Sequence, residues 1–208
     1  GFPVTVGYGM TECAPIITYD DWQDEKLYSC GKAAPNMEVR IDSSDPSKVP
    51  GEIQVKGANV FLGYYKNDDA TRDVFTDDGW FRTGDMGILD ADGSLFIKGR
   101  TKCMILGPSG QNIYPEEVET VLNSQPYVVE SLVVEDNGGL TALIYPDFQQ
   151  GAKDGMSQDA FIRYIEGLLP ELNKELPNYA KLKKIEVMSE DFERTPKKSI
   201  KRYLYQRN

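Results

Sequence analysis

The segment YGMTE at residues 8–12 brings together side chains that could bind a phosphate and a magnesium ion. Glycines flank Tyr8 on both sides, one of them Gly9, and glycine allows a backbone to come close to a ligand. Thr11 offers a hydroxyl suited to a phosphate, and Glu12 offers a carboxylate suited to Mg²⁺. Taken alone, the same five residues could form an ordinary tight turn.

A second segment, GWFRTGD at residues 79–85, ends in Asp85. A carboxylate that follows a Thr-Gly turn can accept hydrogen bonds from both vicinal hydroxyls of a ribose, because each of its two oxygens carries acceptor lone pairs. We therefore predict that the Asp85 carboxylate binds a ribose. The alternative is an aspartate that caps its own local turn.

Residues 99–119, GRTKCMILGPSGQNIYPEEVE, combine a basic pair, a glycine-punctuated loop and a helix start. Arg100 and Lys102 form the basic pair, and GPSG at 107–110 forms the loop. Pro115 suits the first helical position, and the glutamates after it complement the positive end of the helix dipole. These features together suggest a junction between two bodies, and the alternative is an ordinary loop-to-helix connection.

Strands must position the first two segments. Alternating apolar residues predict a short strand over 4–6 and a run of short strands over 29–65, the last of them beginning at FLGYYK. A two-residue Asp92-Gly93 turn predicts a hairpin over 86–98. We interpret the residues between 29 and 65 as scaffold and assign them no chemistry.

The second half of the chain alternates helices and strands. The pattern predicts a helix over 114–123, a hairpin of 128–135 and 140–145 across Asp-Asn-Gly-Gly, a helix from about 157 and a last strand over 182–188. We predict an α+β fold in which a β-rich subdomain (1–100) precedes a small, mobile α+β domain (101–208).

Composition excludes several classes of function. The net charge of −10 opposes general binding of nucleic acids, whose phosphates are also negative. Residues 178–208 nevertheless carry nine Lys and Arg against four Asp and Glu, which is either a solvated face or the source of a lysine for an anionic substrate. The chain has no histidine, so a histidine base or a histidine-ligated metal is excluded.

The chain's cysteines and hydropathy suggest its compartment. Three irregularly spaced cysteines favour neither a disulfide framework nor a zinc site, and no apolar run approaches the roughly 20 residues that span a bilayer. We expect a cytoplasmic protein. Peripheral contact with membrane lipid and the oligomeric state are left open. Because the chain begins without a methionine, we expect it to be a fragment.

These segments resemble motifs of the AMP-forming acyl-CoA synthetase or adenylate-forming superfamily, most closely its long-chain fatty acid–CoA ligase branch. The family patterns Y-G-x-T-E and G-W-[FL]-x-T-G-D match residues 8–12 and 79–85. The hinge pattern of the family matches Gly99, Arg100, Lys102, Ile105, Gly110, Ile113, Pro115, Glu117, Val118 and Glu119. The resemblance covers this whole chain but only about the C-terminal third of a family member.

The resemblance implies a role for each matched site residue. It implies that Tyr8 lies by the adenine, with Gly9 allowing close approach, and that Thr11 touches the α-phosphate. It implies that Glu12 holds magnesium and that Asp85 binds the ribose. Further along the chain, it implies that Arg100 contacts the ribose or a phosphate and that Lys102 is the hinge of a mobile domain.

The end of the chain resembles the last motif of the family, T-x-x-G-K-[IV]-x-R, whose lysine neutralises charge between the substrate carboxylate and the α-phosphate. An ungapped match that aligns Thr195, Ile200 and Arg202 places Ser199 at the lysine and Lys198 at the glycine. We assign the catalytic role to Lys198, which requires a slip of one residue. Lys197 and Lys201 are the substitutes.

The activity implied is that of an ATP-dependent, AMP-forming fatty acid–CoA ligase that uses Mg²⁺, with coenzyme A as the acceptor. The family's phosphate-binding loop and most of its acyl pocket are missing from this sequence, so we expect the fragment alone to be inactive. The alternatives are an aryl-acid or phenylacetate–CoA ligase, an adenylation domain that loads a carrier protein, or a non-catalytic fragment or binding module.

Overall fold

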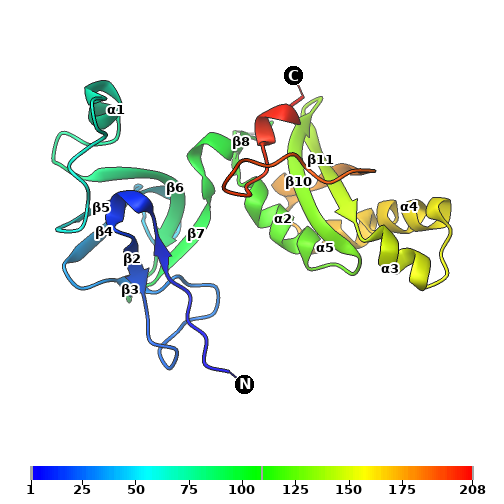
Figure 1. Ribbon diagram of the computed structural model, residues 1–208, viewed down its shortest axis with the longest axis horizontal. Helices are drawn as coiled ribbons and strands as arrows, with labels where there is room; N and C mark the ends of the chain where they lie inside the picture. The colour runs from blue at the N-terminus through cyan, green and yellow to red at the C-terminus, as the bar shows by residue number, and fades with distance from the viewer. Residues whose placement is uncertain (1, 109, 208) are drawn as a thin grey trace. The chain divides into compact units, whose positions relative to one another are not determined.

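The computed structural model describes residues 2–108 and 110–207 (Figure 1). These residues form two compact units that divide between Lys102 and Cys103, two residues beyond the boundary expected from the sequence. Ser109, part of the expected glycine loop, lies outside the described residues. Among the described residues, no helix has the length and apolar character that a membrane crossing requires.

The first unit is built from two antiparallel sheets. The smaller sheet contains β1 (Tyr8–Gly9), β2 (Ile16–Tyr19) and β3 (Lys32–Ala33). The larger contains, in spatial order, β4 (Met37–Asp42), β5 (Gly51–Gly57), β6 (Phe81–Leu89) and β7 (Leu95–Arg100). One short helix, α1 (Asp68–Asp73), lies in the connection between β5 and β6. Buried side chains of both sheets share one core, which includes Ile17, Ile53 and Phe81.

The second unit is a three-stranded sheet with helices. β10 (Val128–Asp136) pairs antiparallel with β11 (Gly139–Pro146), which pairs parallel with β12 (Leu182–Val187). The helices are α2 (Pro115–Asn123), α3 (Phe148–Lys153), α4 (Gln158–Glu166) and α5 (Leu169–Glu175), and the short strands β8 (Ile105–Leu106) and β9 (Asn112–Ile113) pair before α2.

The sheet of the second unit is covered differently on its two faces. Side chains of α2, α4 and α5, including Leu122, Phe161 and Leu172, pack on one face. On the other face the C-terminal tail, red in Figure 1, brings Phe192 against Leu132, so the tail is part of a core.

The predicted α+β class is confirmed, with corrections to individual elements. The helix beginning at Pro115, the hairpin across 136–139 and the helix capped by Ser157 are confirmed. The strand expected over 4–6 is wrong, because those residues are exposed and no strand pairs with them. FLGYYK at 61–66 is also not a strand, since it bends through Gly63 (φ 148°) and Lys66 (φ 54°).

The core of the second unit yields a stability prediction. Leu122 is 0% exposed in α2, so Leu122→Ala should lower the free energy of unfolding by about 2–5 kcal/mol through lost burial and a residual cavity. Leu106→Ala in the same unit is the control: that side chain is 63% exposed, and the change should stay within about 0.5 kcal/mol. Urea denaturation measures both, and equal midpoints would contradict the assigned core.

Candidate functional site

Three of the predicted site residues meet in the first unit. The Tyr8 hydroxyl donates a hydrogen bond to Asp85 Oδ2 at 2.6 Å, and Arg100 Nε lies 3.3 Å from Asp85 Oδ1. Asp85 and Arg100 are direct partners in the β6–β7 register, whereas Tyr8 comes from β1, 77 positions earlier in the chain than Asp85. The Asp85 side chain is 14% exposed, so its carboxylate is mostly enclosed but reachable.

Thr83 and Gly84 do not form the expected turn but an irregular stretch within β6, and this stretch aims the Asp85 carboxylate. Gly84 has φ of +74°, a left-handed conformation that glycine adopts without the penalty a side chain brings. Thr83 Oγ1 accepts a hydrogen bond from the Asp85 amide at 3.1 Å and donates one to the Ile53 carbonyl at 2.8 Å. This irregular stretch of β6 is therefore tied to β5, and the direction of Asp85 is set by the sheet.

The electrostatics of the cluster keep Tyr8 a neutral donor. Burial raises the pKa of the Tyr8 phenol far above its ordinary value, and the Asp85 carboxylate adds to the shift. A carboxylate has about four acceptor positions. Tyr8 takes one position on Oδ2 and Arg100 forms an ion pair with Oδ1, so both oxygens of Asp85 retain capacity to accept further hydrogen bonds.

The loop after β1 is held tightly by its backbone. A Cβ at Gly9 would lie 2.0 Å from the Pro15 carbonyl oxygen, so only glycine fits there. The Met10 amide donates to the same oxygen at 2.8 Å. The loop continues into a short 3-10 helix (Thr11–Cys13) in which Thr11 is exposed.

Glu12 has a partner that the sequence analysis missed. The Tyr64 hydroxyl donates to Glu12 Oε1 at 3.1 Å, and the Phe61 amide donates to the Glu12 carbonyl at 2.8 Å. The segment around Tyr64 is not the expected strand but a bend that packs against the loop. The sequence contains no indication of this contact, because Tyr64 lies in a segment interpreted as scaffold.

The thiol that follows Glu12, Cys13, is fully buried. Burial raises the pKa of Cys13 to about 11, with a further contribution from the Glu12 carboxylate. The reactive thiolate is therefore scarce at neutral pH.

Within the described part of the chain, no group of three or more acidic or thiol side chains could hold a metal ion. Mg²⁺ commonly binds one or two carboxylates plus substrate phosphates, and the single Glu12 carboxylate fits that mode.

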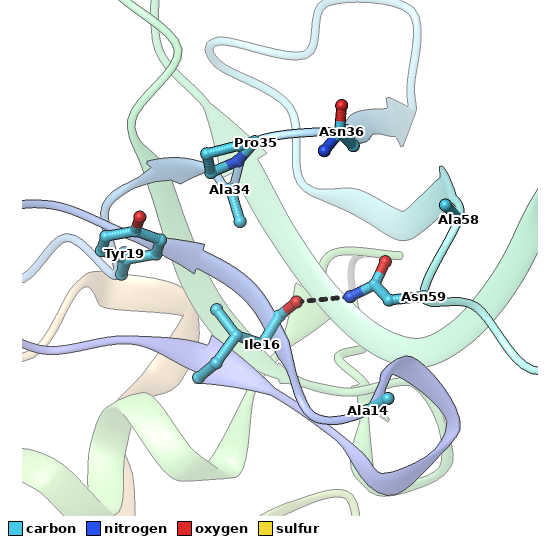
Figure 2. A pocket seen from close by; sticks show the side chains of 8 residues that line it. All are labelled: Ala14, Ile16, Tyr19, Ala34, Pro35, Asn36, Ala58 and Asn59. Atoms are coloured by element: carbon cyan, nitrogen blue, oxygen red, sulfur yellow. Dashed lines mark hydrogen bonds between the residues drawn. The ribbon is translucent and has the colours of Figure 1, made fainter.

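An open, mostly apolar pocket lies beside this loop (Figure 2). Its volume is about 600 Å³, and its lining combines residues that follow the loop with residues from β3 onward: Ala14, Ile16, Tyr19, Ala34, Pro35, Asn36, Ala58 and Asn59. Asn59 Nδ2 donates to the carbonyls of Ile16 at 2.9 Å and Cys13 at 2.6 Å. The Asn59 amide thus fixes one wall of the pocket.

Two further predicted residues are Lys102 and Lys198. Lys102 is exposed in a short 3-10 helix (Thr101–Cys103) and is the last residue of the first unit. Lys198 lies in the tail of the second unit. The roles of both residues stay predictions.

The tail forms a tight hairpin around Lys198. The Lys198 amide donates to the Thr195 carbonyl and the Thr195 amide donates to the Ser199 carbonyl, both at 2.8 Å, and Arg194 forms a bridge with Ile200. Lys198 has φ of +64°, as expected for the residue after a type I turn in a three-residue hairpin loop, where glycine is preferred. Lys198 thus has a conformation that favours glycine, and it is the residue to which the ungapped match aligns the motif's glycine.

Comparison with known proteins assigns the family. A family model described as AMP-binding enzyme matches residues 1–65, and one described as AMP-binding enzyme C-terminal domain matches residues 104–208. The chain belongs to the AMP-binding enzyme family. The expected resemblance is thereby confirmed.

Relatives within the AMP-binding enzyme family carry different substrate names. The long-chain-fatty-acid–CoA ligase FadD15 of Mycobacterium bovis is 31% identical over 97% of this chain and 36% of its own. The 2-succinylbenzoate–CoA ligase of Bacillus velezensis is 44% identical over 62% of this chain and 27% of its own. The chain thus spans about a third of the length of the curated relatives it matches.

Solved structures of this family share the fold. The o-succinylbenzoate CoA synthetase MenE of Bacillus subtilis, in complex with ATP and magnesium, is 33% identical with a TM-score of 0.82, over 98% of this chain and 41% of that one. ATP-bound MatB from Rhodopseudomonas palustris is 31% identical with a TM-score of 0.78, over 99% of this chain and 40% of that one.

The hydrogen bond within the cluster can be tested by its stability effect. Tyr8→Phe should lower the free energy of unfolding by about 1–2 kcal/mol, because a donor to a mostly enclosed carboxylate is lost. Tyr28→Phe is the control, since Tyr28 is 84% exposed. Urea denaturation of both variants checks this, and a Tyr8→Phe midpoint equal to that of the control would refute the contact.

Proposed function

We propose that this chain is part of an AMP-forming acid–CoA ligase and supplies the ribose-binding side of its nucleotide site. The observation that carries the proposal is the Asp85 carboxylate, held by Tyr8 and Arg100 in a chain of the AMP-binding enzyme family. Both oxygens of Asp85 keep acceptor capacity, which a ribose diol would use.

The neighbouring residues are assigned accordingly. Tyr8 and Gly9 border the adenine, and the exposed Thr11 hydroxyl donates to the α-phosphate. Arg100, whose side chain is 70% exposed, is available to the ribose or a phosphate. The Glu12 carboxylate would hold magnesium, which would shield the phosphate charge when bound.

The proposed reaction has two steps. First, a carboxylate oxygen of the acid attacks the α-phosphorus of ATP, the bond to the bridging oxygen breaks, and pyrophosphate leaves, giving acyl-AMP. Then the thiol of coenzyme A adds at the acyl carbon, its proton is lost to solvent, and AMP leaves. The protein contributes positioning and charge neutralisation rather than a general base, so the absence of histidine is compatible with this chemistry.

A change of conformation between the two steps is assigned to Lys102. The two units divide directly after this residue, which supports a hinge there. We assign residues 1–100 to the end of a large domain and residues 101–208 to a small mobile domain. The catalytic lysine that neutralises charge in the first step is assigned to Lys198.

For the acid, a long-chain fatty acid is our first proposal. The fatty-acid ligase relative aligns over 97% of the chain, and the pocket beside the loop is lined mostly by apolar side chains. An aryl acid is the alternative, supported by the higher identity of the 2-succinylbenzoate ligase over a shorter stretch.

Acid-dependent exchange of labelled pyrophosphate into ATP tests the proposed function. We expect exchange by the natural gene product that contains this sequence, with a higher rate for palmitate than for benzoate, and none by the 208-residue chain alone. No exchange by the natural product with any acid would overturn the ligase assignment. Exchange by the 208-residue chain would overturn only the expectation that it is inactive by itself.

The ribose assignment predicts a loss of affinity. Asp85→Asn removes the charge but not the size, and should weaken AMP binding at least tenfold, because a charge-assisted acceptor is lost. Asp77→Asn, an exposed aspartate nearby, is the control and should leave affinity unchanged.

Calorimetry with AMP and with 2′,3′-dideoxy-AMP makes the test specific to the diol. The wild-type protein should prefer AMP, and Asp85→Asn should lose that preference. An unchanged preference in the variant would remove the ribose from Asp85.

The tail hairpin predicts that a substitution of Lys198 affects pyrophosphate exchange but not stability. Lys198→Gly removes the ammonium group while suiting the left-handed φ, so it should slow pyrophosphate exchange at least tenfold without lowering the unfolding midpoint. Lys201→Ala should have a smaller effect, because Lys201 Nζ already pairs with Glu193 at 3.1 Å. Ser199→Lys, which places an ammonium at the ungapped motif position, is the complementary variant. If only Ser199→Lys changes the exchange rate, and does so by raising it, Lys198 is not the catalytic lysine.

A further inference from the structure

Two charged residues meet within the second unit. Glu119 lies in α2, and Arg202 lies in a short 3-10 helix (Arg202–Leu204) of the C-terminal tail. Each belongs to a motif noted in the sequence, and neither has a role in the proposed reaction. Arg202 Nη2 pairs with Glu119 Oε2, and the two side chains are only 25% and 10% exposed.

The Glu119 carboxylate joins three segments. Its Oε1 accepts a hydrogen bond from the Val133 amide of β10 at 2.7 Å, while its Oε2 takes Arg202 from the tail. Glu116, one turn earlier in α2, places Oε1 3.8 Å from Arg202 and keeps Oε2 buried without a hydrogen-bond partner among the described residues. Helix, sheet and tail are therefore fixed to one another through one buried charge.

The tail hairpin begins and ends at anchored points. Before it, Arg194 pairs with Glu130 of β10, and Phe192 packs edge-on against Tyr205 with ring centroids 5.3 Å apart. After it, two residues beyond Ile200, comes Arg202. The exposed residues between these anchors include Lys197 and Lys198, and neither ammonium group has an ion-pair partner in the part of the chain that the structure describes.

We infer that Glu119 and Arg202 form a positioning pair that holds the base of the tail hairpin and so determines where the lysines at its tip are presented. Buried ion pairs add little net stability compared with apolar packing, but they fix one geometry, because any displacement leaves a charge unpaired. The catalytic consequence of this inference rests on the proposed function, while the positioning itself does not.

Limited proteolysis of the 208-residue chain tests the positioning without any activity. Trypsin cleaves after lysine, so cleavage after Lys197 or Lys198 reports the mobility of the hairpin tip. Cleavage after Arg163, within α4, reports opening of the second unit as a whole. Glu119→Gln keeps an acceptor for the Val133 amide but removes the charge opposite Arg202. It should raise tip cleavage at least tenfold relative to cleavage after Arg163.

The control is Glu193→Gln, which breaks the more exposed pair with Lys201 and should change tip cleavage less than twofold. Should Glu119→Gln fail to fold, Arg202→Met keeps the buried carboxylate bonded to Val133 and replaces the guanidinium with an apolar chain of similar reach. It should show the same selective rise. Tip cleavage that stays unchanged, or that rises only in proportion to cleavage after Arg163, overturns the positioning role.

Pyrophosphate exchange by the natural gene product then tests the catalytic consequence. Glu119→Gln should lower the maximal exchange rate at least tenfold and change the KM for ATP less than twofold, because the nucleotide cluster lies in the other unit. Selective tip cleavage with an unaltered exchange rate would confirm the positioning pair and overturn its link to catalysis. An absence of exchange in the wild type refutes the proposed function and leaves the proteolysis result standing.

Discussion

The hydrogen bond between Tyr8 and Asp85 is the constraint on which the first unit's site depends. It links β1 of the smaller sheet to β6 of the larger sheet. Burial keeps the Tyr8 phenol neutral, so it remains a donor and cannot become a second negative charge beside Asp85. The orientation of the carboxylate follows, because Tyr8 takes one oxygen, Arg100 lies beside the other, and Gly84, with its positive φ, fixes the backbone within β6.

In the second unit, an ion pair helps to fix the direction of the C-terminal tail. A tail of irregular structure cannot hold its own direction through a regular ladder of hydrogen bonds, so it needs side-chain anchors. Phe192 supplies an apolar anchor beneath the sheet, and Arg202 supplies a charged one at α2. The apolar anchor tolerates small shifts, whereas a buried charge does not, and the two together give attachment and direction.

Local chemistry made part of this structure predictable. Pro115 and Ser157 mark helix starts, and the Asn137-Gly138 turn sets the β10–β11 hairpin, because each signal acts within a few residues. The family motifs picked out Tyr8 and Asp85, but not the bond between them, since a bond across 77 positions depends on how two sheets pack.

The errors have the same origin. Alternation at 4–6 and the aromatic residues of 61–66 favour strands locally, yet a strand also needs a neighbour to pair with, and a local pattern cannot supply one. Tyr64 was consequently assigned to scaffold, although its hydroxyl reaches Glu12.

The tail hairpin offers a conformational argument about the register of the last motif, which residue identity leaves open. Lys198 is the residue with positive φ in this hairpin, and a side chain there costs on the order of 1 kcal/mol relative to glycine. Aligned by conformation, the glycine of the motif falls on Lys198 and the lysine on Ser199. Because a serine hydroxyl carries no positive charge, an ammonium acting there must come from a neighbour. Lys201 is paired with Glu193, which leaves Lys197 and Lys198 as the candidates that the hairpin presents.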